Sequence, residues 1–140
     1  MEVINAAHVN NEQAGAFFGT PDDGPIVMIN LLTFKEFATY EDGSDPTLSG
    51  EDAYLRYGAL LDGPNGVLAK FGAKLLYSGK TTGLLLGSVE EEWDAVALVE
   101  YPSTSGMLAM VMSPEYNAID HHRYAGLSGQ LNIRTKPLGA

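Results

Sequence analysis

The stretch from residue 93 to residue 127, WDAVALVEYPSTSGMLAMVMSPEYNAIDHHRYAGL, constrains the fold more than any other part of the chain. Residues 94–101 are an apolar run of strand length, and the proline that follows ends the strand because it has no backbone N–H to donate. Ser103 then caps a helix whose apolar face is rich in methionine. Ser-Pro-Glu at 113–115 begins another helix, with serine as N-cap and an acidic residue in the first turn, where the helix dipole favours it. We predict a strand followed by two helices, the second running toward Tyr124.

The rest of the chain supplies the elements that complete two β-α-β halves. We predict two further helices, at 10–18 and at 50–71, and the second is interrupted by a Gly-Pro-Asn-Gly segment between residues 61 and 67. We also predict three further strands, at 26–34, 74–80 and 130–135. Strand, helix, strand, then strand, helix, strand is the order of the ferredoxin-like fold, whose four-stranded antiparallel sheet carries its helices on one face. The predicted class is α+β, and residues 1–140 are predicted to form one domain.

The first predicted strand is apolar on both of its faces. Met28 and Leu32 point to one side, and Val27, Ile29 and Leu31 point to the other, because successive side chains of a strand alternate. Helices can cover only one side of a ferredoxin-like sheet, so the other would expose a large hydrophobic patch in a monomer. We therefore predict a homodimer in which two sheets face each other.

Two segments lie outside this repeated plan. Residues 1–24 are predicted to be an N-terminal extension that contains the short helix. Residues 37–50 are acidic and rich in Gly, Ser and Pro, which predicts a surface loop. That loop is either a lid, a dimer arm or an ordinary solvated connection.

Charge and cysteine content exclude several classes of partner. The chain has 8 Lys+Arg against 18 Asp+Glu, a net charge of -10 that would repel nucleic acid and anionic membrane surfaces. It has no cysteine, which excludes disulfides, thiolate metal sites and a cysteine nucleophile, and it fits a reducing compartment. Its first residues lack the basic start and apolar run of a signal peptide, so we expect a cytoplasmic protein.

Familiar catalytic and nucleotide-binding motifs are incomplete in this sequence. Gly79-Lys80-Thr81 is similar to the end of a P-loop, but Lys74 stands where the upstream glycine is required. Gly126-Leu127-Ser128-Gly129 lacks the last glycine of a nucleophile elbow, because position 130 is glutamine. Neither motif therefore predicts a phosphate site or a serine hydrolase.

His121, His122 and Arg123 form a cluster of ionisable residues at the end of a predicted helix. Neighbouring helical residues point about 100° apart, so both imidazoles cannot bind one metal from a regular helix, and we predict no metal site. The cluster either complements the helix dipole or supplies an acid, a base or an anion-binding group to a pocket.

Six more polar residues are candidates for a pocket. Asn30 interrupts an apolar strand and must find hydrogen-bond partners if it is buried, either a ligand or a neighbouring strand. Glu100 on the third predicted strand is either a base with a raised pKa or the partner of a nearby Lys or Arg. Arg56, Tyr57 and Tyr77 would add substrate-binding groups, and Tyr54 supplies further pocket-type chemistry, although tyrosines at such spacing are often core residues.

Several segments together resemble the domain-of-unknown-function 1330 (DUF1330) family. They are NLLTF at 30–34, AYLRYG at 53–58, LLYSG at 75–79, EEWDAVALVEYPS at 91–103 and SPEYNAIDHHRYAGL at 113–127. The resemblance implies a dimeric α+β barrel, in which two ferredoxin-like sheets pair. That superfamily includes cofactor-free monooxygenases, isomerases, haem-degrading enzymes and ligand-sensing domains, so the resemblance does not specify a reaction.

These observations leave three hypotheses for function. The first is an enzyme that acts on a small aromatic or carbonyl compound by His-assisted proton transfer or cofactor-free oxygenation, without a bound cofactor. Its candidate catalytic residues are His122, His121 and Glu100, and its candidate substrate-binding residues are Asn30, Arg56, Tyr57, Tyr77 and Arg123. The second is a non-catalytic binding or sensing module with the same pocket, and the third is a structural or accessory homodimer without one.

Overall fold

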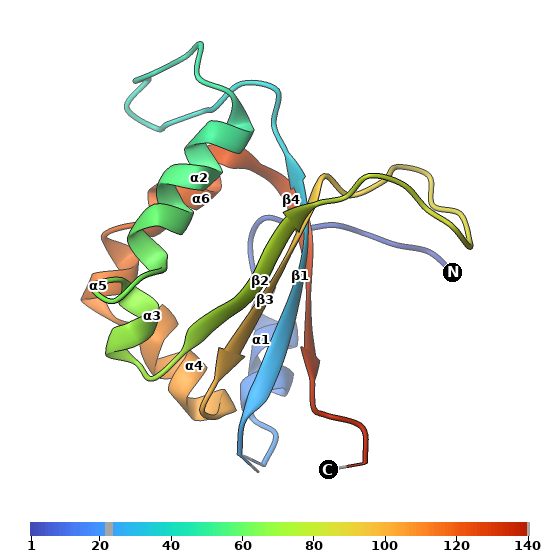
Figure 1. Cartoon of the computed structure of the whole chain (residues 1–140). Helices are drawn as coiled ribbons and strands as arrows, with labels where there is room; N and C mark the ends of the chain where they lie inside the picture. The colour runs from blue at the N-terminus through green and yellow to red at the C-terminus, as the bar shows by residue number, and fades with distance from the viewer. Residues whose placement is uncertain (22–23, 140) are drawn as a thin grey trace.

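One antiparallel sheet forms the centre of the computed structural model, which describes residues 1–21 and 24–139. Its strands lie in the order β2-β3-β1-β4 (Figure 1). They are β1 (Ile26–Phe34), β2 (Lys74–Lys80), β3 (Ala95–Tyr101) and β4 (Leu127–Thr135). All three pairings between neighbours are antiparallel, as in the ferredoxin-like fold that the order of elements predicts.

The helices lie on one side of this sheet (Figure 1). They are α1 (Asn11–Phe18), α2 (Gly50–Leu61), α3 (Val67–Lys70), α4 (Thr104–Val111), α5 (Pro114–Asn117) and α6 (Asp120–Gly126). The core lies between the two layers, where the largest fully buried side chains are Ile26, Met28, Leu32, Leu68, Met110 and Leu127. Each such side chain stabilises the fold by about 1.5–3 kcal/mol relative to an exposed one.

Serine side chains begin three of the helices, including the two for which we predict a serine cap from the sequence. Ser49, Ser103 and Ser113 accept hydrogen bonds from backbone N–H groups three residues ahead. Each bond satisfies a donor that the first helical turn leaves unpaired. The predicted interruption after α2 is also present, and Gly72 adopts a positive φ of 71° just beyond α3.

Two predicted boundaries in the C-terminal half are wrong. The single helix expected after Ser113 is divided into α5 and α6, because Ile119 is buried and its N–H bonds only three residues back, to Tyr116. The last strand begins at Leu127 rather than at residue 130. Leu127 is fully buried and pairs with Phe34 across an irregularity in the register, so strand pairing overrides the local Ser-Gly turn signal.

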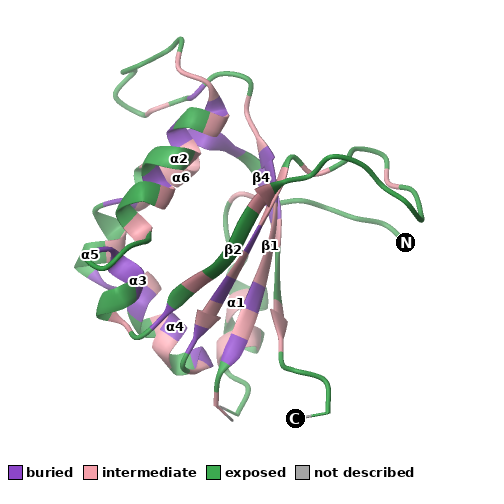
Figure 2. Cartoon of the chain, in the orientation of Figure 1, coloured by how far each residue is buried: buried purple, intermediate pink, exposed green. Residues whose placement is uncertain are grey.

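The face of the sheet away from the helices has no helix over it (Figure 1). We call it the open face. Its side chains are mostly apolar and only half-buried within one chain: Val27, Ile29, Leu31, Val96, Leu98 and Leu131. Residues 81–94, between β2 and β3, project beyond this face and are exposed along most of their length (Figure 2). This loop carries three consecutive exposed leucines, of which Leu85 is 96% exposed.

The acidic loop at residues 37–50 is held against the helical layer. The backbone N–H of Ala38 bonds to Leu48, and that of Thr39 bonds to the carbonyl of Ala125 at the end of α6. Ala38 is buried. Within the described residues, no helix of the chain is long and apolar enough to cross a membrane.

Candidate functional site

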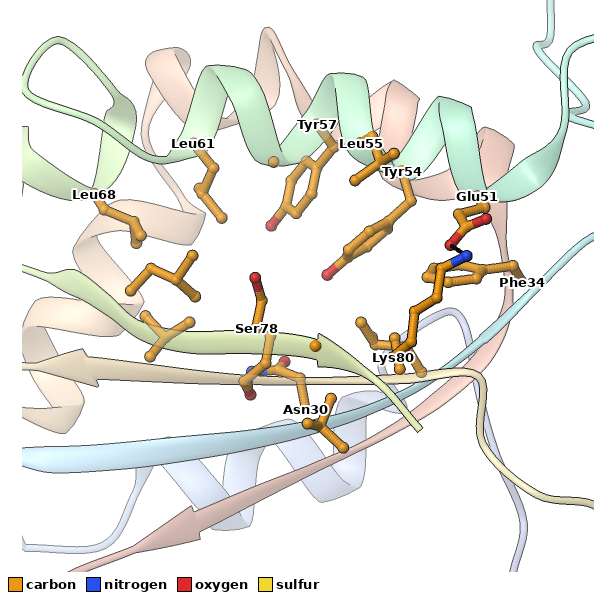
Figure 3. Close-up of a pocket in the computed structure, with 18 of the residues that line it drawn as sticks. Asn30, Phe34, Glu51, Tyr54, Leu55, Tyr57, Leu61, Leu68, Ser78 and Lys80 are labelled. Carbon is orange, nitrogen blue, oxygen red and sulfur yellow. Dashed lines mark hydrogen bonds and ion pairs between the residues drawn. The ribbon is translucent and has the colours of Figure 1, made fainter. Parts of the chain in front are cut away.

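A cavity of about 290 Å³ lies between α2 and strands β1, β2 and β3 (Figure 3). Most of its wall is hydrophobic and includes Leu32, Leu55, Leu61, Leu68, Leu75 and Val99. Its volume is close to the lower end of the range for small-molecule sites, about 300–1,000 Å³. We call it the sheet cavity.

Hydroxyl groups supply much of the polar surface of the sheet cavity. Tyr54 and Tyr57 on α2 and Ser78 on β2 point into the same space (Figure 3), and Tyr101 also lines it. The Tyr57 hydroxyl lies 2.9 Å from the hydroxyl of Tyr116. Within the described residues, the hydroxyls of Tyr54, Ser78 and Tyr101 have no hydrogen-bond partner. These three groups can therefore bond to a ligand.

The tyrosines of this site stay protonated well beyond neutral pH. Burial raises the pKa of Tyr54 to about 12, and it raises the pKa of Tyr57 well above the ordinary value, with a further contribution from Tyr116. Burial also raises the pKa of Tyr101. The cause is the loss of water around a phenolate that would carry charge. At physiological pH these hydroxyls are hydrogen-bond donors and poor bases.

Asn30 lines the sheet cavity, and its amide is fully engaged with neighbouring strands. Its Nδ2 donates to the carbonyl oxygen of Ala97 at 3.2 Å, and its Oδ1 accepts from Nε2 of Gln130 at 3.1 Å. Gln130 Oε1 in turn accepts from Nη2 of Arg123 at 2.8 Å. The alternative in which Asn30 is satisfied by neighbouring strands is therefore the one observed.

Charge is confined to one end of the sheet cavity. There, Nζ of Lys80 lies 3.1 Å from Oε1 of Glu51, close to the ring of Phe34 (Figure 3). Among the described residues that line the cavity, these two carry the only formal charges, and they neutralise each other. The interior therefore favours an uncharged ligand over an ion.

The two neighbouring histidines belong to a different cluster, on the outer side of the helical layer. Nδ1 of His122 lies 2.7 Å from the hydroxyl of Tyr40, and the rings of His121 and His122 are 4.0 Å apart. Arg56 lies over the Tyr40 ring and forms a 2.9 Å ion pair with Asp45. The cluster ties the acidic loop to α2 and α6.

This histidine cluster and the sheet cavity are separate. Burial lowers the pKa of His122, and the positive charges of His121 and Arg56 lower it further. Neither histidine nor Arg56 is among the described residues that line the sheet cavity. No residue of the loop 37–50 lines it either, so the position of that loop does not support a role as a lid.

The other predicted site residues lie elsewhere. Glu100 is on the open face, 3.8 Å from Nζ of Lys74, which is the pairing expected as an alternative to a catalytic role. Tyr77 is also on that face and is 59% exposed. Arg123 donates to the carbonyl oxygen of Ala7 at 2.9 Å and lines a second cavity, near the N-terminal segment.

The predicted residues therefore do not converge on one cavity. Only Asn30, Tyr54 and Tyr57 share the sheet cavity, and the catalytic and binding roles assigned to the others stay predictions. Ser78 and Tyr101 were not identified as site residues from the sequence. Tyr54 and Tyr57 are three apart on one helical stripe, and both line the cavity. In the described part of the chain, no group of three or more His, Asp or Glu side chains is arranged to hold a metal ion.

Comparison with known proteins places the chain in a family. Residues 44–135 match the model of the domain of unknown function DUF1330. The chain belongs to this family. No curated protein matches it. The N-terminal residues before 44 lie outside the match.

Solved structures of similar proteins share the fold of this chain. A crystal structure of a protein of unknown function from Rhodopseudomonas palustris is 33% identical, with a TM-score of 0.81 over 98% of this chain and 100% of that one. A crystal structure of the methylated form of that protein gives the same identity and TM-score over 96% and 97%. A dabb family protein from Mesorhizobium loti, described as having a ferredoxin-like fold, is 16% identical, with a TM-score of 0.56 over 84% of this chain and 100% of that one. The last likeness supports the fold alone.

Proposed function

We propose that this DUF1330 protein binds a small, uncharged aromatic or carbonyl-bearing molecule in the sheet cavity. The observation that carries the proposal is the set of unpaired hydroxyls on Tyr54, Ser78 and Tyr101 in an otherwise hydrophobic cavity. Protonated hydroxyls donate to a carbonyl or phenolic oxygen, and the hydrophobic wall packs against the rest of the molecule. The internal pairing of Glu51 with Lys80 leaves no free charge for an ionic ligand.

A binding or sensing role has more support than catalysis. A His-assisted reaction needs an imidazole within hydrogen-bond reach of the ligand, and His121 and His122 lie outside the sheet cavity. The tyrosines have raised pKa values and stay protonated at neutral pH. They can therefore orient or polarise a carbonyl group of the ligand, but they cannot act as a base and remove a proton from the ligand. In the proposed function, the protein therefore binds its ligand without converting it to a product.

We also propose that the functional unit is a homodimer in which two open faces pack together. The support is the half-buried apolar surface on β1, β3 and β4, which a second identical sheet would cover by two-fold symmetry. The loop of residues 81–94, which carries the exposed leucines, projects on the same side (Figure 1) and would contact that partner. A cytoplasmic location, expected from the composition, stays a prediction.

Ligand binding can be tested with acetophenone and phenol as uncharged probes and benzoate as the charged counterpart. Isothermal titration should detect saturable binding of an uncharged probe. In two-dimensional NMR, an uncharged probe should shift the backbone amides of α2, which lines the sheet cavity, and benzoate should shift them much less. Tyr54→Phe and Tyr101→Phe should each weaken binding by about 2- to 10-fold, because each removes one hydrogen bond but keeps the ring.

Tyr40→Phe is the matched control, because Tyr40 bonds to His122 outside the sheet cavity. It should leave the affinity of the uncharged probe unchanged. Equal weakening by Tyr40→Phe and Tyr54→Phe would contradict the assignment of the site. So would larger shifts of the α2 backbone amides with benzoate than with acetophenone at the same concentration.

A further inference from the structure

A second cavity, of about 360 Å³, lies on the helical side of the sheet next to β4. The N-terminal segment 4–10 and helix α1 form one wall, and β4 with the core residues Met28 and Met107 forms the other. We call it the N-terminal cavity. Most of its wall is built by residues before 44, which lie outside the DUF1330 match. It is separate from the sheet cavity, with which it shares no lining residue.

The N-terminal segment that closes this cavity is held by specific contacts. Ala6 pairs with Gln130 through two backbone hydrogen bonds of 3.0 Å, and the indole of Trp93 donates to Oδ1 of Asn5 at 2.7 Å. A Cβ at Gly129 would lie 2.9 Å from Cβ of Asn5, so the segment approaches β4 as closely as it does because position 129 is glycine. These contacts fix the position of the N-terminal segment against β4, so the wall that it forms has one defined place in the fold.

The polar centre of the N-terminal cavity is Arg123. Two of its five N–H groups donate to neutral acceptors, the carbonyl oxygen of Ala7 and the side-chain oxygen of the buried Gln130. Its guanidinium also lies 5.1 Å from the centre of the Tyr124 ring. Within the described residues, no Asp or Glu lines this cavity or forms an ion pair with Arg123.

Arg123 is thus a half-buried cation without an ion-pair partner, in a chain whose net charge is -10. Asp120, on the same helix α6, does not line the cavity; burial raises the pKa of Asp120, and the positive charge of Arg123 opposes that rise. A guanidinium presents paired donors that match the two oxygens of a carboxylate, and that match is strongest away from bulk water. The hydrophobic side chains that line the same cavity, such as Phe17, Phe18 and Ile4, suit the apolar part of a ligand.

We propose that the N-terminal cavity is a second small-molecule site, specific for an aromatic or aliphatic carboxylic acid whose carboxylate binds Arg123. The exposed amide of Asn132 and the side chain of Gln13 line the same cavity and supply further donors. The site differs in chemistry from the sheet cavity, which favours uncharged molecules. The two sites are joined through the hydrogen-bonded series from Arg123 through Gln130 to Asn30.

The test compares phenylacetate with phenylacetamide, which has the same shape without the charge. In isothermal titration, phenylacetate should bind with saturation, and the amide should bind at least about 10-fold more weakly. In two-dimensional NMR of the whole chain, phenylacetate should shift the backbone amides of residues 4–10 and leave those of α2 in place. Shifts confined to α2, or no saturable binding up to about 10 mM, would overturn the proposal.

Two variants separate the role of charge from that of shape. Arg123→Gln should weaken phenylacetate by about 10-fold or more and leave phenylacetamide nearly unchanged. Ala14→Phe keeps Arg123 and fills the cavity from α1, so it should abolish binding of both probes. Ala14→Phe should not change acetophenone binding at the sheet cavity, which distinguishes failure of this site from failure of the proposed function. Phenylacetate binding that both variants leave intact would refute the assignment.

Discussion

The buried tyrosines of the sheet cavity should make the protein sensitive to alkaline pH. The pKa of Tyr54 is about 12 in the folded state, whereas the pKa of a tyrosine in the unfolded chain is about 10. Its contribution to stability is complete below about pH 10 and is lost as the pH rises through about 12. Over that range the unfolded state releases a proton that the folded state retains, which favours unfolding.

The magnitude follows from that difference of about two pH units, at about 1.4 kcal/mol for each. At pH 11.5, Tyr54 alone should lower the free energy of unfolding by about 2 kcal/mol relative to pH 9. Tyr57 and Tyr101 should lower it further, because burial raises their pKa values as well. Urea unfolding followed by circular dichroism at the two pH values measures the sum.

Comparison of variants isolates the contribution of one phenol. Tyr54→Phe should lose about 2 kcal/mol less stability between pH 9 and pH 11.5 than the unmodified protein does. Tyr77→Phe removes an exposed tyrosine from the open face and controls for the loss of a tyrosine as such. If Tyr54→Phe and the unmodified protein lose the same amount, the Tyr54 hydroxyl is not buried in the cavity and the reasoning fails.

Three more outcomes test other parts of the structure. Tyr57→Phe should lower the free energy of unfolding by about 1–3 kcal/mol because it leaves the Tyr116 hydroxyl without its partner, and adding Tyr116→Phe should restore part of that loss in a double-mutant cycle. Ile29→Asp at the centre of the open face should convert the proposed homodimer into a 15.0 kDa monomer in sedimentation velocity, and a monomeric unmodified protein at micromolar concentration would contradict the dimer. Met110→Ala should cost about 2–5 kcal/mol in urea unfolding because Met110 is only 1% exposed, and a loss below about 1 kcal/mol would show that the site collapses around the shorter side chain.

Much of the fold could be predicted because local signals and long-range packing agree. The strand at Ile26–Phe34 is apolar along its length, and serine caps mark the starts of α2, α4 and α5. Where prediction failed, a contact with a distant residue decided the outcome. Leu127 extends β4 because it pairs with Phe34, about ninety residues earlier, and nothing in its immediate neighbours shows that pairing.

The site was harder to predict than the fold because it depends on which side of each element a residue faces. His121, His122 and Arg123 are consecutive, yet the histidines turn to Tyr40 while Arg123 turns to the N-terminal segment. Consecutive helical positions diverge by about 100°, so a cluster in sequence becomes two clusters in space. Ser78 could not be identified either, because an irregularity between Leu75 and Tyr77 shifts the alternation of β2.

The close contact at Gly129 predicts which DUF1330 proteins can form the N-terminal cavity from the residue that they have at this position. A side chain there would place its Cβ 2.9 Å from Cβ of Asn5 and 3.3 Å from the backbone carbonyl carbon of Asn5, so the N-terminal segment would have to shift away from its present path. A relative with a larger residue at this position should therefore lack the wall that closes the N-terminal cavity, whatever stands at position 123. Glycine at position 129 together with arginine at position 123 would then be the pair of residues that identifies the members with the proposed carboxylate site.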